Sequence, residues 1–458
     1  MSFSALHFRQ ALLPQGWAQE VRVLIADGAF SRIDVGVPPE AGDERYSIGV
    51  PGMPNLHCHA FQRGMAGLSE TRGPSSDSFW TWREVMYRFL EALTPEDVEA
   101  IAALAYCEML ETGFTRVGEF HYLHHGPDGQ PYDNIAEMAE RIAAAANLTG
   151  IGLTLLPSLY VHGGFGGQNP DPGQRRFINS VDQFAKLHEA SRAATESVEG
   201  SVVGIAPHSL RAVTPDELFA AIEIGGASPI HIHVAEQIKE VAACLAWSER
   251  RPVQWLLENM PVDTRWCFIH ATHMTPDETA KLSYSGAVAG LCPLTEASLG
   301  DGTFNGATFA GAGGLYGVGS DSNILIGAAD ELRQLEYSQR LQYRQRNVMT
   351  TQEGASTGET LYRSALEGGA RALGAASAIV VGNEANVVTL DVEHPSLIGR
   401  PAEQILDSWI FAAGSGGRAN AVQDVWSRGQ KVVANGRHIA RDAIARRYGE
   451  AMRRVLSA

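Results

Sequence analysis

Between about Gly49 and Gly374, short apolar runs alternate with longer segments whose apolar residues recur at helical spacing. One helical segment, 95–113, follows a plausible N-cap at Thr94 and opens with Pro-Glu. Eight runs start apolar and end in polar or titratable residues: GVPGMPNLHCH, FTRVGEFHY, IGLTLLPSLY, SVVGIAPHSL, PIHIHVAE, WCFIHATH, AVAGLCPLTE and LYGVGSDSN. Strands that alternate with helices favour a parallel sheet, and eight such units predict a (β/α)8 TIM barrel.

The two ends of the chain have a different pattern. Residues 1–48 and 375–458 contain short apolar or alternating runs separated by Gly and Asn, which is typical of strands joined by turns. We therefore expect an α/β protein in which residues 1–48 and 375–458 together form a small β-sandwich domain. The barrel is expected to span residues 49–374.

Composition and charge limit the possible partners. Hydrophobic residues make up 45% of the 458 positions and charged residues 19%, so the chain can bury a large core. The 36 Lys and Arg against 52 Asp and Glu give a net charge of −16, without the basic stripe that nucleic acid requires. The same sign argues against anionic membranes, and no apolar stretch approaches a membrane span.

The remaining compositional signals concern the compartment. The first residues lack the apolar core of a secretory signal, and the five cysteines are odd in number and contain no CxxC pair. We expect a cytoplasmic protein with free thiols and a small-molecule partner.

The candidate chemistry lies at the predicted strand ends, where barrel enzymes place their active sites. His57 and His59 flank Cys58, and side chains alternate along a strand, so both imidazoles are expected to point into the barrel. Two imidazoles suit a divalent cation such as zinc, although an HxH pair alone is weak evidence.

Later strands add further candidates. His233 at a strand mouth is a stronger candidate ligand than His231, which is deeper and is expected to fill the core with its nitrogens hydrogen-bonded. Glu236 follows three residues after His233, where a general acid or base could act. His270 ends the sixth strand and could polarise a bound group or carry a proton, and Asp321 ends the eighth and could bind a metal or accept a proton.

The order of HxH, HxxE, a strand-end His and SD resembles the amidohydrolase superfamily over the whole chain, including its split β domain. Within that superfamily, several strings resemble the formimidoylglutamate deiminase family, which removes ammonia from N-formimino-L-glutamate in histidine degradation. These strings are PNLHCHAFQR, DSFWTWRE, EFHYLHH, HSLRAVTP, HIHVAEQ, HATH, TEASLGDG and GSDSN. HAFQR and FWTWRE are far more specific than HxH.

The resemblance implies roles for individual residues. The metal ligands would be His57, His59, His233 and Asp321, and the catalytic residues would be Glu236 and His270 together with Asp321. The substrate-binding residues would be Gln62, Arg83, Tyr122, His208 and Arg211. Two-metal members commonly bridge their ions with a modified Lys or a carboxylate on an intermediate strand, but the segment SVVGIAPHSLRAV contains neither. We therefore expect one divalent ion, with Zn²⁺ as the first candidate. The resemblance also implies a homodimer.

The implied substrate fits the residues. An N-formimino amino diacid carries two carboxylates, and guanidinium groups bind carboxylates through paired hydrogen bonds, so Arg83 and Arg211 could each bind one. Glu236 would protonate the departing nitrogen, which leaves ammonia and N-formyl-L-glutamate. Which Arg binds which carboxylate stays open, as does whether Asn323 lines the pocket.

Two other functions compete with this one. The first is a mononuclear-metal deaminase or chlorohydrolase of an aminated heterocycle, for which two guanidinium groups would be unnecessary. The second is a non-catalytic barrel, which is disfavoured because every candidate ligand and catalytic residue is present. The glycine-rich segment 163–167 has no following GK[ST], so it predicts a mobile loop over the site instead of a phosphate cradle.

Overall fold

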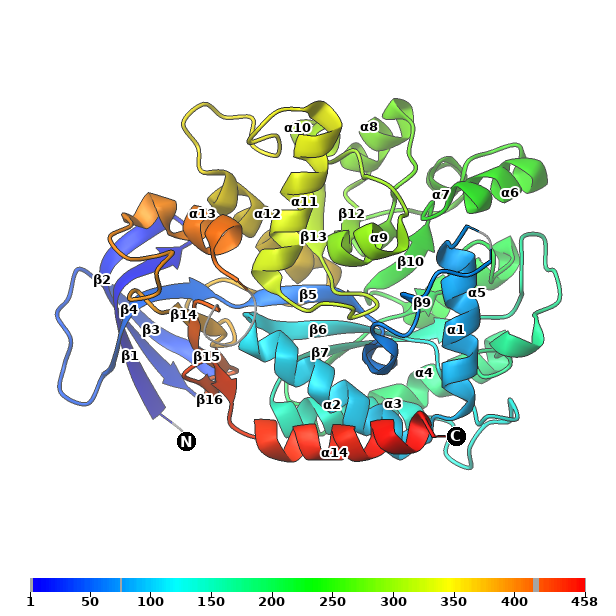
Figure 1. Cartoon of the computed structure of the whole chain (residues 1–458), viewed down its shortest axis with the longest axis horizontal. Coiled ribbons are helices and arrows are strands. Elements are labelled where there is room, and N and C mark those ends of the chain that lie inside the picture. The colour runs from blue at the N-terminus through cyan, green and yellow to red at the C-terminus, as the bar shows by residue number, and fades with distance from the viewer. Residues whose placement is uncertain (1–2, 75, 415–419, 458) are drawn as a thin grey trace.

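The computed structural model describes residues 3–74, 76–414 and 420–457, and it contains a barrel with a terminal sheet beside it (Figure 1). The barrel strands are β5 (Met53–Cys58), β6 (Phe114–His121), β7 (Gly152–Leu159), the short pair β8 (Val202–Val203) and β9 (Ala206–Pro207), β10 (Ile230–Val234), β11 (Trp266–His270), β12 (Val288–Leu291) and β13 (Leu315–Val318). Neighbouring strands pair in parallel, in the runs β5-β6-β7-β8 and β10-β11-β12-β13, with β9 paired to β7.

Isolated parallel bridges join the two runs into a ring. Ile205 pairs with Ile230, and Cys58 pairs with Asp321, so the last strand meets the first. The fourth strand is split into β8 and β9 at Gly204, where a Cβ atom would lie 2.6 Å from the Pro229 carbonyl oxygen. The predicted barrel of eight βα units is confirmed, and its fourth strand is shorter than expected.

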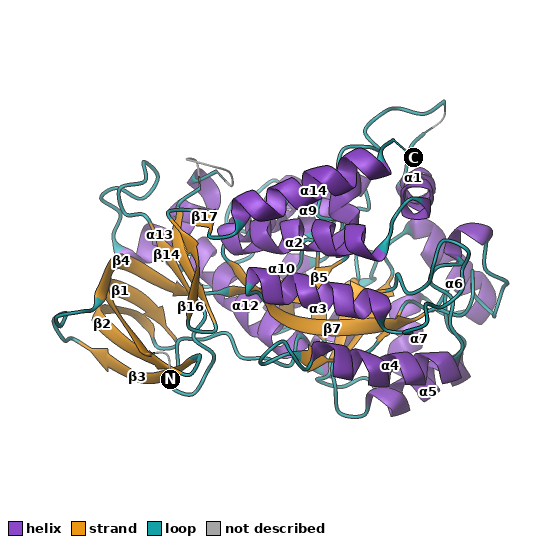
Figure 2. Ribbon diagram, turned by 90° about the horizontal axis from the view of Figure 1, so that it is seen from below, coloured by secondary structure: helices purple, strands orange, loops and turns teal. Residues whose placement is uncertain are grey.

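Helices surround the barrel. They are α1 (Phe79–Glu91), α2 (Pro95–Glu111), α3 (Glu137–Thr149), α4 (Val181–Thr195), α5 (Pro215–Gly225), α6 (Ile238–Ser248), α7 (Pro252–Asn259), α8 (Pro276–Ser285), α9 (Pro293–Leu299), α10 (Gly306–Gly311), α11 (Ala328–Tyr343) and α12 (Thr357–Ala372), with 3-10 turns η1 (Ala60–Met65) and η2 (Pro172–Gln174). Thr94 caps α2 as predicted, and Thr214 and Thr275 cap α5 and α8 in the same Thr-Pro arrangement. Figure 2 shows α2, α3 and α4 side by side, with α14 (Arg441–Val455) packed on α2.

Both chain ends form the second part of the molecule, as predicted. The order of its eight strands is β17-β16-β15-β14-β4-β1-β2-β3. Their bounds are β1 (Phe3–Leu13), β2 (Gly16–Ala26), β3 (Ala29–Val35), β4 (Glu44–Pro51), β14 (Val387–Leu390), β15 (Val422–Ser427), β16 (Gln430–Ala434) and β17 (Arg437–His438). Antiparallel pairing of β4 with β14 unites the two ends, and α13 (Ala402–Ala412) packs on α12.

The terminal sheet includes residues that the strand pattern had grouped with the barrel. Val387 pairs with Pro51 and Thr389 with Gly49, so residues 49–51 belong to β4, and the first barrel strand begins at Met53.

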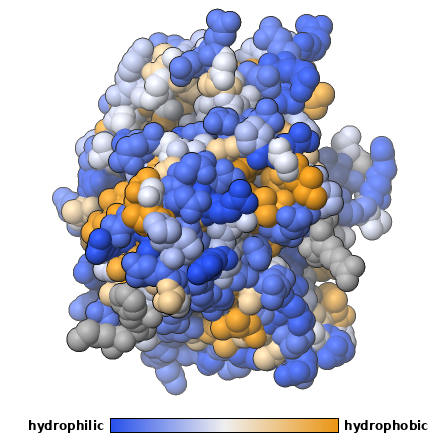
Figure 3. All heavy atoms as spheres, turned by 90° about the vertical axis from the view of Figure 1, so that its left-hand side faces the viewer, coloured by the Kyte–Doolittle hydropathy of each residue, from blue (hydrophilic) through white to orange (hydrophobic). Residues whose placement is uncertain are grey.

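Seen from the side of the terminal sheet, the molecule is covered mainly by hydrophilic side chains with separate apolar areas between them (Figure 3). Over the described ranges, none of the helices is long and apolar enough to cross a membrane. All five cysteines are buried free thiols, as predicted.

Candidate active site

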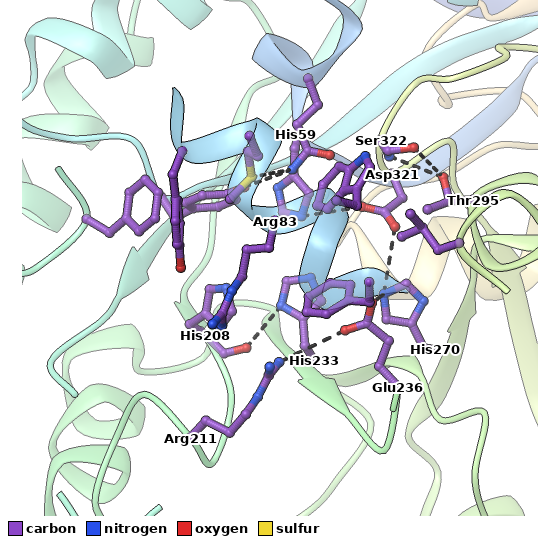
Figure 4. Close-up of a pocket in the computed structure, with 18 of the residues that line it drawn as sticks. His59, Arg83, His208, Arg211, His233, Glu236, His270, Thr295, Asp321 and Ser322 are labelled. Atoms are coloured by element: carbon purple, nitrogen blue, oxygen red, sulfur yellow. Dashed lines mark hydrogen bonds and ion pairs between the residues drawn. The ribbon is translucent and has the colours of Figure 1, made fainter. Parts of the chain in front are cut away.

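The four predicted metal ligands lie close together at the carboxyl ends of the barrel strands, and Figure 4 shows three of them, His59, His233 and Asp321. His57 lies near the end of β5, and His59 directly follows that strand. His233 lies in β10, and Asp321 follows β13. The Nε2 atoms of His57 and His59 each lie 3.4 Å from Asp321 Oδ1, and His57 Nε2 lies 3.2 Å from His233 Nε2. All four side chains are buried.

Backbone carbonyls orient two of these imidazoles. His59 Nδ1 lies 2.9 Å from the Phe120 carbonyl oxygen, and His233 Nδ1 lies 3.1 Å from that of His208, so both rings turn Nε2 towards the cavity. Asp321 lies where the last barrel strand meets the first. Its N–H donates to the His57 carbonyl oxygen, and its own carbonyl oxygen accepts from the His59 N–H.

This donor set fits a divalent cation. Donor atoms that share one ion at zinc-ligand distances of about 2.0 to 2.2 Å lie about 3 Å apart. The three separations given above, 3.4, 3.4 and 3.2 Å, are close to this value. Burial lowers the pKa of His57 to about 3, which keeps the imidazole neutral as a ligand must be. Burial opposes charge on Asp321, but the surrounding histidines, led by His57, hold its pKa below the usual range, so the carboxylate is ionised.

Glu236 and His270 lie beside the ligands. His270 Nε2 is 3.9 Å from Glu236 Oε1 and 3.8 Å from Asp321 Oδ2, and its Nδ1 is 3.2 Å from Glu296 Oε1. Burial raises the pKa of Glu236 to about 7, which suits an acid that works near neutrality. Burial opposes charge on His270, but the three carboxylates outweigh it and raise its pKa to about 10.

The backbone at these residues is unusual. His270, Asp321 and Ala235 have φ angles of 68°, 44° and 51°, in the left-handed region that side chains other than Gly seldom adopt. The Glu240 carboxylate accepts from the N–H groups of Ala235 and Glu236 and so holds this turn in place. Strained backbone of this kind gathers where structure fixes functional groups.

The five predicted substrate-binding residues line the same cavity: Gln62, Arg83, Tyr122, His208 and Arg211. Gln62 Nε2 donates to the Tyr122 hydroxyl at 2.8 Å, and one Arg211 nitrogen lies 4.0 Å from the Glu236 carboxylate. Figure 4 shows the Arg83 and Arg211 side chains entering from different elements, α1 and the loop after β9.

Several polar atoms of this wall lack partners. Among the described residues, Gln62 Oε1, Arg83 Nε and Arg211 Nε are buried without a hydrogen bond. Buried polar groups are almost always paired in folded proteins, so three orphans around one cavity indicate a polar ligand. Two of them are guanidinium nitrogens, which favours an anion with more than one oxygen.

Sequence reasoning missed the aromatic part of the wall. Phe79, Trp82, Met86 and Tyr87 line the cavity from α1, and Tyr160, Phe177, Thr295, Leu299 and Ser322 complete it. The α1 residues together with Arg83 follow the helical spacing i, i+3, i+4, i+7, i+8, and this periodicity was the signal that could have found them.

Two residues discussed above lie outside the cavity. His231 lies in the core, as predicted, and its Nε2 lies 2.8 Å from the Ala372 carbonyl oxygen. Its Nδ1 has no hydrogen-bond partner among the described residues, although one was expected. Asn323 is fully buried, and its amide donates to the His59 and Asp321 carbonyl oxygens at 3.0 Å each. Asn323 therefore braces the ligands from behind and does not line the pocket.

Comparisons with known proteins agree with this geometry. Residues 48–437 match the model of the Amidohydrolase family, and residues 3–47 match that of the Formimidoylglutamate deiminase HutF, N-terminal domain. The chain is 48% identical to the formimidoylglutamate deiminase of Pseudomonas aeruginosa, covering 99% of this chain and all of that protein.

More distant and structural relatives were also found. A 5-methylthioadenosine/S-adenosylhomocysteine deaminase of Shouchella clausii is 26% identical over 94% of each chain. The crystal structure of an amidohydrolase from Brucella melitensis superposes with a TM-score of 0.95 at 55% identity, covering 99% of this chain and all of that one.

Proposed function

The chain belongs to the amidohydrolase family and, within it, to the formimidoylglutamate deiminase family, and we propose that it hydrolyses N-formimino-L-glutamate to N-formyl-L-glutamate and ammonia. We further propose that this reaction serves histidine degradation. The structural observation that carries the substrate assignment is the pair Arg83 and Arg211, which line the same cavity as His59, His233 and Asp321 and each have a buried guanidinium nitrogen without a hydrogen bond to any described residue.

One divalent ion, with Zn²⁺ as the first candidate, is proposed to bind His57, His59, His233 and Asp321. When bound, it would supply a water molecule activated at neutral pH. Three imidazoles and one carboxylate leave room for that water, and SVVGIAPHSLRAV offers no Lys or carboxylate to bridge a second ion.

Proton movements are assigned to the residues beside the ligands. Asp321 accepts the proton of the attacking water. His270, whose Nε2 atom lies 3.8 Å from Asp321 Oδ2 and whose pKa of about 10 keeps it protonated at neutral pH, polarises the bound group. Glu236 donates a proton to the substrate nitrogen, because an amidine nitrogen leaves far more readily as ammonia than as an amide ion. Its pKa of about 7 leaves a substantial protonated fraction at neutral pH.

Substrate binding is assigned to the wall. Arg83 and Arg211 each bind one carboxylate, since a guanidinium group can donate two parallel hydrogen bonds to it. Gln62 presents its free Oε1 to a donor such as the formimino N–H, while its Nε2 is held by Tyr122. Burial and the charge of Arg211 keep the pKa of His208 well below its ordinary value, so this ring binds as a neutral hydrogen-bonding group.

The test is ammonia release by metal-analysed protein across a substrate panel. The panel contains N-formimino-L-glutamate, N-formimino-L-aspartate, N-guanidino-L-glutamate and aminated heterocycles such as guanine, cytosine and adenosine. We expect turnover to be fastest with N-formimino-L-glutamate. Turnover confined to the heterocycles would overturn the assignment and favour the alternative of a heterocycle deaminase.

A further inference from the structure

Two surface depressions adjoin the active-site cavity, and they share different parts of its wall. One is lined by segments 68–72 and 77–88 and shares Trp82 and Leu299 with the cavity. The other is lined by Trp80, Lys239 and Trp247 together with loop 163–168, and it shares Arg83 and Arg211 with the cavity. A substrate could approach the cavity from either side.

The charges of the two depressions differ. The first carries Glu70 and Asp77 against Arg72 and Arg88, so its formal charges cancel. The second carries the cations Arg83, Arg211 and Lys239 against a single carboxylate, Glu240. That carboxylate is buried and already accepts from two backbone N–H groups, so the solvent-facing side of the second depression is positive.

Trp80 gathers the three cations at the second depression. Lys239 Nζ lies 4.5 Å from the centre of a Trp80 ring, Arg83 Cζ lies 4.7 Å from it, and Arg211 Cζ lies 6.0 Å from it. The indole face attracts each cation, which offsets part of their mutual repulsion. Three cations around one ring still favour an anion, because the repulsion between them remains.

The glycine-rich segment forms the opposite side of this depression. Phe165 packs against Trp247 of α6, with 5.6 Å between ring centres. Gly166 has a φ of 73°, and a Cβ atom there would lie 3.2 Å from Trp247. The glycines therefore let the loop lie close against α6, where Gly163 and Gly164 border the depression beside Lys239.

We propose that this second depression, the Trp80 vestibule (Trp80, Arg83, Arg211, Lys239 and loop 163–168), is the entrance for the substrate, and that Lys239 is its outer anion-binding residue. The proposal rests on the proposed function, which makes the substrate a dicarboxylate with a net charge of about −1. The protein carries −16, so its overall field opposes such a substrate. A local positive route counters this field, and Lys239 transfers the anion to the arginines.

The test compares Lys239→Gln with Arg88→Gln, which removes the same charge from the other depression. We expect Lys239→Gln to lower kcat/KM for N-formimino-L-glutamate about 5-fold at low ionic strength with kcat nearly unchanged. Lys239→Glu should lower it further, by about 20-fold. In 1 M salt, where the Debye length is about 3 Å, the loss should shrink to about 2-fold or less. Arg88→Gln should remain near the wild-type value throughout.

Equal values for Lys239→Gln and Arg88→Gln, or a loss independent of salt, would overturn the vestibule. Failure of the proposed function gives a different result, namely no ammonia release from N-formimino-L-glutamate by the wild-type protein. Calorimetric binding of glutarate then still tests the vestibule, because it requires no turnover. In low salt, Lys239→Gln should weaken glutarate binding by about the same 5-fold factor, whereas Arg88→Gln should leave it near the wild-type value. Unchanged binding by Lys239→Gln would again overturn the proposal.

Discussion

Two parts of the cavity are built in different ways. The floor consists of the proposed metal ligands together with Glu236 and His270, and the wall carries Gln62, Arg83, Tyr122, His208 and Arg211. On the floor, imidazoles and carboxylates at strand ends contact one another and the backbone. Each of His57, His59, His233 and Asp321 has an atom within 3.2 to 3.4 Å of another proposed ligand. On the wall, Arg83 and Arg211 approach from a helix and a loop and leave guanidinium nitrogens unpaired. The floor is arranged for chemistry, and the wall is incomplete without a ligand.

This difference predicts separate kinetic effects. Changes to the floor should act mainly on kcat, because its groups act on bonds that form and break. Changes to the wall should act mainly on KM, because its groups hold parts of the substrate that do not react.

The largest expected effect is that of Glu236→Gln. Glutamine keeps the shape of the side chain but cannot donate the acid proton, so kcat should fall by about 10³-fold or more. Metal content should stay at the wild-type level, since Glu236 is not among the proposed ligands. Ammonia release and metal analysis of the same preparation test both points, and an active, metal-replete variant would contradict the assigned role.

Arg211→Gln should have the next largest effect, and it should act on KM. The loss of a charge-assisted pair with a carboxylate costs about 2 to 3 kcal/mol, which is about 30- to 150-fold in KM. Steady-state kinetics measure this, with Arg88→Gln as a control in which an arginine outside the cavity loses the same charge. If KM for Arg211→Gln remains at the wild-type value, Arg211 does not bind a carboxylate.

Glu296→Gln sharpens the comparison, because Glu296 contacts His270 on the floor but itself lies outside the cavity lining. Its carboxylate lies 3.2 Å from His270 Nδ1 and also accepts from Cys292 N–H at 2.9 Å. An amide in its place removes the negative charge that orients His270, so kcat should fall about 10-fold while KM changes little. A matching rise in KM would instead indicate a general loss of structure.

The sequence predicted the floor because strand periodicity determines it. In HxH and IHIH the alternation of faces assigns direction to each side chain, and the end of an apolar run marks the mouth of the barrel. The polar groups of the wall came from the family resemblance. Its aromatic residues on α1 were missed: their helical spacing is visible in the sequence, but the placement of that helix over the barrel depends on packing.

Errors in the strand pattern have a similar cause. Residues 49–51 and the barrel strand from Met53 form one nearly continuous extended segment, so only the pairing of β4 with β14 separates sheet from barrel. The sequence pattern also could not place Asn323. The Ser320 hydroxyl donates to the Asn323 side-chain oxygen behind the proposed ligands, and a spacing of three residues does not reveal this contact.

The smallest expected effect on turnover is that of His231→Gln, and it tests how sharply the floor ends within one strand. His231 and His233 share a face of β10, but only His233 reaches the ligand cluster, whereas His231 bonds the Ala372 carbonyl oxygen at 2.8 Å. Metal content, kcat and KM should therefore remain at wild-type values in His231→Gln. The changed buried hydrogen bond should lower the free energy of unfolding by about 1 to 3 kcal/mol.

The matched variant is His233→Gln, which should lose bound metal and activity together. Denaturant unfolding gives the stability change, and metal analysis of both variants gives the contrast. If folded His231→Gln lost its metal, His231 would also contribute to the metal site, and the site would reach deeper into the barrel than the distances between the proposed ligands indicate. His231 and His233 are the same residue type on the same face of one strand and differ only in their depth in the barrel. Comparing the two variants therefore tests whether position along the strand decides which histidine binds the metal.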